Sequence, residues 1–195
     1  MNNTTKLKKL LSLNKTVFTL NDLSVIWGQD KRSNTSQSAK EYAKAGELVR
    51  LRRGLYMLPN AEPTLSEIAG KLVVPSYLTG ETVLKKHGLS FQMSNHVTSA
   101  ALVSRKIDLN GMTYTYYRFA DGIFFNSYGI EYENGTAIAS RERAIADLLY
   151  LNGDSYIFED LTSIDWQKLA EAGKIYGKKS VMENIRKLEA RYAER

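Results

Sequence analysis

The stretch 34–58 most constrains how this chain can fold. Residues 34–45 predict a short helix, because Ala39, Tyr42 and Ala43 recur at helical spacing and would form one buried stripe. Polar and basic residues occupy the remaining positions, so we expect them on the exposed face. The glycine that follows at position 46 tolerates the left-handed conformation in which helices commonly end.

Residues 47–58 predict a β-hairpin. Gly54 permits a tight reversal, and the chain returns as a second strand that Pro59 ends. We expect the first strand to place its side chains on two opposite sides: Leu48, Arg50 and Arg52 on one, and Val49, Leu51 and Arg53 on the other. A polar-faced helix followed by an arginine-bearing hairpin is typical of the recognition helix and wing of a winged helix-turn-helix.

The residue types of this stretch suit DNA. Serine, threonine and glutamine side chains near a helix N-terminus can donate to and accept from base edges, and lysine and arginine neutralise phosphates. The predicted DNA-binding residues are Lys31, Arg32, Asn34, Thr35, Ser36, Gln37, Lys40, Lys44, Arg50, Arg52 and Arg53. The alternative is a plain helix and hairpin whose charges are only solvated.

Charge along the chain is uneven, and its distribution supports an acidic partner. Residues 1–59 hold 11 lysines and arginines against 4 acidic residues, a net charge of +7, whereas residues 60–195 hold 16 against 17. Such asymmetry favours nucleic acid as the partner of the basic segment. A membrane surface is the rival, but it would favour one amphipathic helix with a basic face. No apolar run is long enough to span a bilayer, and the absence of cysteine suits the cytoplasm.

The residues before the central stretch complete the order expected of a winged helix. Residues 4–13 predict a helix with Leu7, Leu10 and Leu11 inward and Lys6, Lys8 and Lys9 outward, and residues 17–19 predict a short strand. Thr19 and Asp22 form a capping-box pattern that starts a helix ending at Gly28. The expected core side of that helix consists of Leu20, Leu23, Val25, Ile26 and Trp27.

The remaining chain predicts a second, α+β domain after a linker at 60–63. Two Asn-Gly pairs, at 110–111 and 134–135, favour type I′ hairpins, and the strands around them predict an antiparallel sheet of about four strands. Helices are expected at 64–74, capped by Thr64 and Glu67, at 79–87, capped by Thr79, at 141–151, capped by Ser140, at 165–176, capped by Asp165, and at 178–195.

Few residues favour a catalytic site. His87 and His96 lie in no metal-spaced cluster, and Glu131 and Glu133 read better as a solvated edge strand than as nuclease ligands. The tyrosines at 114, 116 and 117 could stack single-stranded bases, but they favour cover for a sheet. We therefore expect no enzyme activity, no cofactor and no metal.

The motifs, taken in order, resemble the AbiEi family of antitoxins, the repressors of type IV toxin–antitoxin and abortive-infection operons. The resemblance spans about residues 15–151. It rests on the helix 34–45 with the Leu-Arg-Arg-Gly-Leu-Tyr segment at 51–56, the segments 77–80 and 83–89, the Asn110-Gly111 hairpin, and the segment 139–150. It implies a repressor of its own operon that also counters a nucleotidyltransferase-like toxin, without requiring a stable complex with that toxin.

The sequence thus predicts an α+β protein with a winged helix-turn-helix at 1–59, a linker at 60–63 and an antitoxin-like domain at 64–195. We expect a cytoplasmic transcriptional repressor that binds double-stranded operator DNA, as a monomer or as a weak dimer that assembles on the DNA. Two alternatives remain open at this point. One is a nuclease or nucleotidyltransferase that a winged helix delivers to nucleic acid, and the other is a module that binds a toxin directly.

Overall fold

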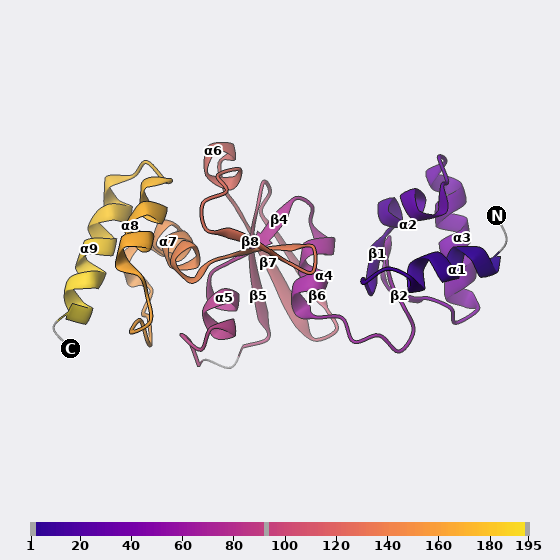
Figure 1. Ribbon diagram of the computed structural model, residues 1–195, viewed down its shortest axis with the longest axis horizontal. Helices are drawn as coiled ribbons and strands as arrows, with labels where there is room; N and C mark the ends of the chain where they lie inside the picture. The colour runs from indigo at the N-terminus through magenta and orange to yellow at the C-terminus, as the bar shows by residue number, and fades with distance from the viewer. Residues whose placement is uncertain (1–2, 92–93, 194–195) are drawn as a thin grey trace. The chain divides into compact units, whose positions relative to one another are not determined.

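The computed structural model describes residues 3–91 and 94–193. The chain divides into two compact units, Met1–Leu72 and Val73–Arg195 (Figure 1). The fold is α+β, as predicted: the first unit contains a small antiparallel sheet and the second a larger mixed sheet. No helix in the described part of the chain is both long and apolar enough to cross a bilayer.

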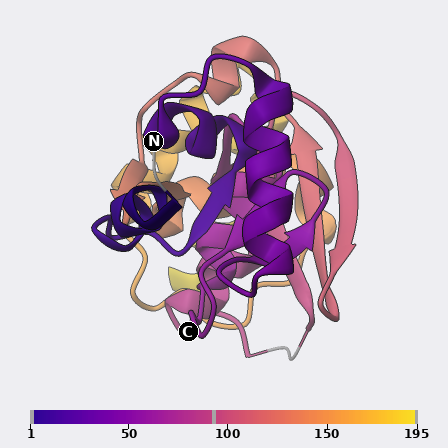
Figure 2. The same cartoon turned by 90° about the vertical axis from the view of Figure 1, so that its right-hand side faces the viewer.

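The N-terminal unit places helices around a three-stranded sheet in the order β1-β3-β2. Figure 2 faces this unit, in which α3 is the longest helix. Its elements are α1 (Asn3–Leu11), β1 (Val17–Thr19), α2 (Leu20–Trp27), α3 (Arg32–Lys44), β2 (Val49–Arg52), β3 (Leu55–Met57) and α4 (Leu65–Leu72). Strand β3 pairs antiparallel with both of its neighbours.

The core of this unit follows the predicted stripes with three exceptions. Leu11 and Val25, which were expected inside, are 60% and 83% exposed. Lys6, which was expected on the outer face of α1, is buried, because it lies one helical turn before Leu10 and so shares the inward face. Its ammonium group donates to the Ser38 hydroxyl of α3 at 3.0 Å.

Helix α2 begins and ends as the sequence predicts. The Thr19 hydroxyl accepts a hydrogen bond from the Asp22 amide at 3.1 Å, and the Asp22 carboxylate accepts one from the Thr19 amide at 2.8 Å. Gly28 ends the helix with φ 62°, in the left-handed region. The predicted capping box is therefore confirmed.

Helix α4, expected in the second domain, belongs by its contacts to the first unit. Its Glu67 carboxylate accepts hydrogen bonds from the Thr16 amide at 2.7 Å, the Thr16 hydroxyl at 2.5 Å and the Val17 amide at 2.9 Å. Thr64 does cap the Glu67 amide, at 3.1 Å, but the reciprocal half of the predicted capping box is absent because Glu67 is turned toward β1. The division between units thus falls after Leu72, beyond the predicted linker at 60–63.

The C-terminal unit is built on a six-stranded sheet in the order β6-β7-β5-β4-β9-β8. Its strands are β4 (Ser76–Leu78), β5 (His96–Ala101), β6 (Arg105–Leu109), β7 (Met112–Arg118), β8 (Ile130–Glu133) and β9 (Thr136–Ala139). Its helices are α5 (Glu81–Lys86), α6 (Asp121–Phe124), α7 (Arg141–Asn152), the 3-10 helix η1 (Gly153–Ser155), α8 (Trp166–Lys174) and α9 (Lys179–Ala193). Helices α5 and α7 pack on the sheet, and α8 and α9 pack on α7 (Figure 1).

The prediction of an antiparallel sheet of about four strands is wrong. Strand β4 was not expected, and it pairs antiparallel with β5 but parallel with β9, while β5 pairs parallel with β7. Both Asn-Gly turns do form hairpins: Asn110 and Gly111 have φ of 51° and 76°, and Asn134 and Gly135 have 48° and 78°. The local sequence thus predicted both hairpins, but it did not predict that they belong to one mixed sheet.

The helix caps at Ser140 and Asp165 are confirmed, since each side chain accepts from the amide three residues later. The cap predicted at Thr79 is wrong: Gly80 precedes α5, and the Thr79 hydroxyl donates to a buried carboxylate instead. Helix α9 buries Val181, Ile185 and Leu188 at helical spacing, while the predicted end of that helix at Arg195 lies outside the described residues.

Candidate nucleic-acid interface

Helix α3 is fixed by its buried face and presents a polar outer face. The Trp27 ring of α2 stacks on the Tyr42 ring of α3 with 5.4 Å between centroids, and Ala39 is buried in the same core. The helix begins at Arg32, two residues earlier than predicted. The hydrophobic contact holds α3 against α2, so its remaining faces are free to carry polar and basic side chains.

The hairpin β2–β3 has a register shift between Arg50 and Arg52, where the strand bulges. Gly54 turns the chain with φ 82°, which an L side chain rarely adopts, and its carbonyl accepts the Leu20 amide at 3.1 Å. The bulge disrupts the strict two-sided alternation that the sequence predicted for this strand. Arg50, Arg52 and Arg53 are all exposed.

A groove of about 880 Å³ lies between the first half of α3 and this hairpin. Its lining includes four basic side chains, two serines and no acidic residue: Arg32, Lys40, Arg50, Arg53, Ser33 and Ser36. Within the described ranges, none of the four cations has a carboxylate oxygen within 4.0 Å. The groove therefore concentrates unneutralised positive charge.

The structure brings together five of the predicted DNA-binding residues in this groove: Arg32, Ser36, Lys40, Arg50 and Arg53. Another five are exposed but do not line the groove: Lys31, Asn34, Gln37, Lys44 and Arg52. The Gln37 amide is engaged on its own helix, where it donates to the Glu41 carboxylate at 2.8 Å. Tyr56 and Ser33 also line the groove and were not predicted.

The prediction that Thr35 contacts DNA is wrong, because its side chain is fully buried. Thr35 lies one turn before Ala39 and two turns before Tyr42, so all three share the inward face of α3. Its hydroxyl, the Trp27 indole N–H and the Gln29 side-chain oxygen have no hydrogen-bond partner in the described part of the chain. The helical spacing of Thr35 from Ala39 and Tyr42 was therefore enough to predict that Thr35 is buried.

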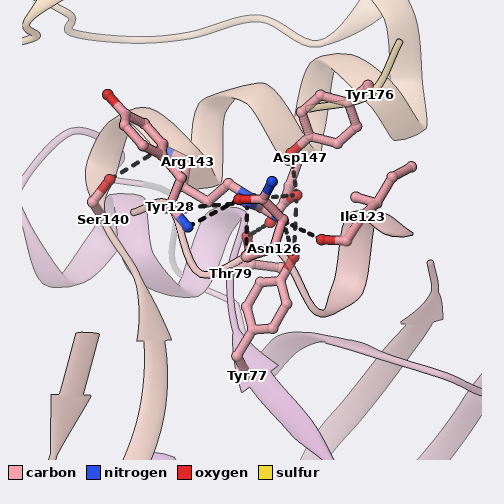
Figure 3. Close-up of polar contacts among 9 residues, drawn as sticks. All are labelled: Tyr77, Thr79, Ile123, Asn126, Tyr128, Ser140, Arg143, Asp147 and Tyr176. Atoms are coloured by element: carbon pink, nitrogen blue, oxygen red, sulfur yellow. Dashed lines mark hydrogen bonds and ion pairs between the residues drawn. The ribbon is translucent and has the colours of Figure 1, made fainter. Parts of the chain in front are cut away.

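The C-terminal unit contains a buried charge network that the sequence analysis missed (Figure 3). Arg143 and Asp147, one turn apart on α7, are both fully buried, and the Arg143 Nε lies 3.3 Å from the Asp147 Oδ1. The guanidinium group also donates to backbone carbonyls of Ile123, Asn126 and Tyr128. An arginine therefore ties α7 to α6 and to the segment between α6 and β8.

The Asp147 carboxylate is matched by three hydroxyl donors from two other segments. It accepts hydrogen bonds from the Thr79 hydroxyl at 2.5 Å, the Tyr77 hydroxyl at 3.4 Å and the Tyr176 hydroxyl (Figure 3). Burial, together with the Asp147 charge, raises the pKa of both tyrosines above the usual value, so their hydroxyls stay protonated and can donate. Burial alone would lower the pKa of Arg143, but Asp147 and the tyrosines hold it above its usual value.

The residues that the sequence analysis considered as catalytic or base-stacking all belong to the C-terminal unit, whereas the groove residues belong to the N-terminal unit. Within the described residues, no group of three or more His, Cys, Asp or Glu side chains could hold a metal ion. Glu131 and Glu133 are exposed on β8, an edge strand of the six-stranded sheet. Tyr114 and Tyr116 are each 1% exposed, which leaves their faces inaccessible to bases.

Comparison with known proteins adds no relative: no protein-family model matches the chain, and no curated protein sequence matches it significantly.

Proposed function

We propose that the chain is a transcriptional repressor whose N-terminal unit binds operator DNA as a winged helix-turn-helix. In this proposal α2 and α3 form the helix-turn-helix, α3 enters the major groove, and β2–β3 is the wing. The observation that carries the proposal is the groove between α3 and the hairpin, whose four cations form no ion pair with the described residues and whose lining has no carboxylate. Arg32 donates to the Asn21 side chain and Arg50 to the Arg52 carbonyl, but these neutral acceptors leave the positive charge available to a polyanion.

The element order supports the same assignment. Helix, short strand, two helices and a hairpin follow one another, and the short first strand pairs with the returning strand of the hairpin. Lys40 and Ser36 lie on α3 where it faces the hairpin, and Arg50 and Arg53 face them from the wing. A duplex seated on α3 would thus meet phosphate-binding side chains from both elements.

The test is the salt dependence of DNA binding. The probe is a fluorescent duplex from upstream of the chain's own gene, measured by anisotropy between about 50 and 200 mM salt. Arg50→Ala with Arg53→Ala should reduce the slope of log K against log salt by about 1.8, because each lost phosphate contact accounts for about 0.9. Lys15→Ala is the control, since Lys15 is exposed in the same unit but neither lines the groove nor belongs to the predicted DNA-binding residues. An unchanged slope in the double variant would contradict the proposal.

The resemblance to AbiEi antitoxins suggests that the C-terminal unit counters a nucleotidyltransferase-like toxin. Co-expression of the full chain with such a toxin from an adjacent gene should restore growth. The Arg50→Ala, Arg53→Ala variant should still restore it while losing repression of a reporter, because these residues belong to the other unit. Loss of both activities in that variant would argue against separate roles for the two units.

A further inference from the structure

The C-terminal unit contains a polar pocket of about 590 Å³ that the proposed repressor function does not use. Residues from the end of α5, from β8, from the start of α7 and from α8 line it. The lining side chains that carry the following argument are His87, Glu131, Arg141, Glu142 and Lys168. The volume lies within the range of small-molecule sites, about 300–1,000 Å³.

The Glu142 carboxylate is the buried group of this pocket, with only 5% of the residue exposed. Its Oε1 accepts the Asp165 amide at 3.4 Å, near the limit of a hydrogen bond, and lies 3.9 Å from the Arg141 guanidinium. Its Oε2 has no hydrogen-bond partner among the described residues. A carboxylate offers about four acceptor positions, and Oε2 is not among the fully buried atoms without a partner, so its free positions reach the solvent of the pocket. Glu142 therefore presents unused acceptor capacity to the pocket.

Two cations stand at the same pocket and are only weakly engaged. The Arg141 guanidinium donates to the Ser163 hydroxyl at 3.1 Å, and the Lys168 ammonium lies 3.7 Å from the Asp165 carboxylate. Both side chains are exposed enough, at 36% and 66%, that these contacts contribute little energy. Arg141 and Lys168 can therefore turn to an anionic group in the pocket.

His87 adds no third positive charge near neutral pH. Burial, followed by the nearby Arg141 and Lys86, lowers its pKa below the usual value, although Glu133 and Glu131 act in the opposite direction. The pocket thus holds carboxylates at Glu142 and Glu131 and cations at Arg141 and Lys168, and the Arg141 guanidinium lies 3.9 Å from the Glu142 carboxylate. A simple anion would meet Glu142 beside Arg141, and a simple cation would meet Arg141 beside Glu142, so a single charge of either sign does not suit the site.

We propose that this pocket binds a zwitterionic small molecule of the α-amino-acid class, with its ammonium group at Glu142 and its carboxylate at Arg141 and Lys168. The ammonium group supplies the donors that Glu142 lacks, and the carboxylate receives the two flexible cations. A ligand that carries both charges only a few bonds apart matches a pocket in which a carboxylate and a guanidinium group lie 3.9 Å apart.

The experiment is isothermal titration of the full chain, without DNA, with each of the twenty proteinogenic L-amino acids. At least one should bind, while its N-acetyl derivative and its carboxamide, which each lack one charge, should bind at least ten-fold more weakly. Glu142→Gln should weaken binding about ten-fold or more, and Lys168→Gln several-fold. Lys174→Gln, on the same helix but outside this pocket, should leave it unchanged.

Binding of none of the twenty amino acids would overturn the proposal, as would equal binding of the N-acetyl derivative or unaltered affinity in the pocket variants. Should Glu142→Gln fail to fold, Arg141→Gln and Lys168→Gln, at partly exposed positions, provide the same decision. The measurement contains no DNA, so its result is independent of the repressor assignment.

Discussion

Arg53 and Arg143 carry the same guanidinium group in opposite surroundings. Arg53 is exposed beside a groove and has no carboxylate within ion-pair distance among the described residues. Arg143 is fully buried and contacts a carboxylate, a tyrosine hydroxyl and three backbone carbonyls. The first keeps its charge available to a ligand, and the second commits it to joining segments of its own unit.

The difference teaches that position, not residue type, decides what a charge does. An exposed cation without an ion-pair partner adds little to folding, so its removal should change the stability of the fold only slightly. A buried cation is tolerated only with its partners, and removing one partner leaves the other desolvated and unpaired. The free energy of unfolding should therefore respond to charge removal in the order of burial.

The largest effect is expected at the buried pair. Asp147→Ala should lower the free energy of unfolding by about 3–5 kcal/mol, because the Arg143 charge would stay buried without its carboxylate. Urea denaturation followed by circular dichroism measures it. The double variant Arg143→Met, Asp147→Leu should lose less than Asp147→Ala alone, and a larger loss would show that the unpaired charge is not the cause.

An intermediate effect is expected at Glu67, which is partly buried and accepts three hydrogen bonds from Thr16 and Val17. Glu67→Ala should lower the free energy of unfolding by about 1–3 kcal/mol, since the backbone amides of Thr16 and Val17 lose their acceptor. Glu62→Ala, an exposed residue of the preceding loop, serves as the control. Equal stability of the Glu67→Ala and Glu62→Ala variants would show that the partly buried carboxylate contributes no more to stability than the exposed one.

A smaller effect, visible only at low pH, is expected at Asp22. Burial alone would raise the pKa of this carboxyl, but hydrogen bonds from Lys71 and Thr19 lower it below the usual 3.8. The lowered pKa means that the ionised form stabilises the fold above pH 3.8 and that this stability is lost as pH falls through the lower, folded-state pKa. The free energies of unfolding of the wild type and of Asp22→Asn, measured by denaturation, should converge as pH falls below about 4. A constant difference between pH 6 and pH 2.5 would refute this linkage.

The smallest effect on folding is expected in the groove. Lys40→Ala should change the free energy of unfolding by no more than about 0.5 kcal/mol, because Lys40 is exposed and unpaired in the described structure. The same variant should weaken DNA binding, whereas Lys15→Ala, at an exposed position outside the groove, should not. A stability loss at Lys40 comparable to that at Glu67 would break the comparison.

Local signals in the sequence predicted much of the N-terminal unit. Helix α3, the hairpin and the Thr19–Asp22 capping box each depend on neighbouring residues, so spacing and cap chemistry suffice to find them. The sequence predicted which residue types would bind DNA, but it did not predict which of these residues line one groove. The bulge in β2 and the early start of α3 select which five of the predicted side chains meet, and neither has a local sequence signal.

The C-terminal unit was less predictable because its sheet depends on pairing between distant segments. The parallel contacts of β4 with β9 and of β5 with β7 join strands that local periodicity treats separately. The Arg143–Asp147 pair did leave a signal: two opposite charges four residues apart lie among the apolar residues of α7. Solvated pairs have the same spacing, so only the packing of α5, α8 and the sheet around α7 identifies this pair as buried.

The contact of Glu67 with the start of β1 decides where the chain can be cut. Proline and small polar residues at 60–63 suggest a natural place to separate two modules, yet a fragment ending there would lack the carboxylate that receives the Thr16 and Val17 amides. An autonomous N-terminal fragment would need to continue through Leu72. The segment 60–63 has the composition of a linker, but α4 just after it holds the start of β1 through Glu67. A fragment that ends within 60–63 would therefore lose that contact.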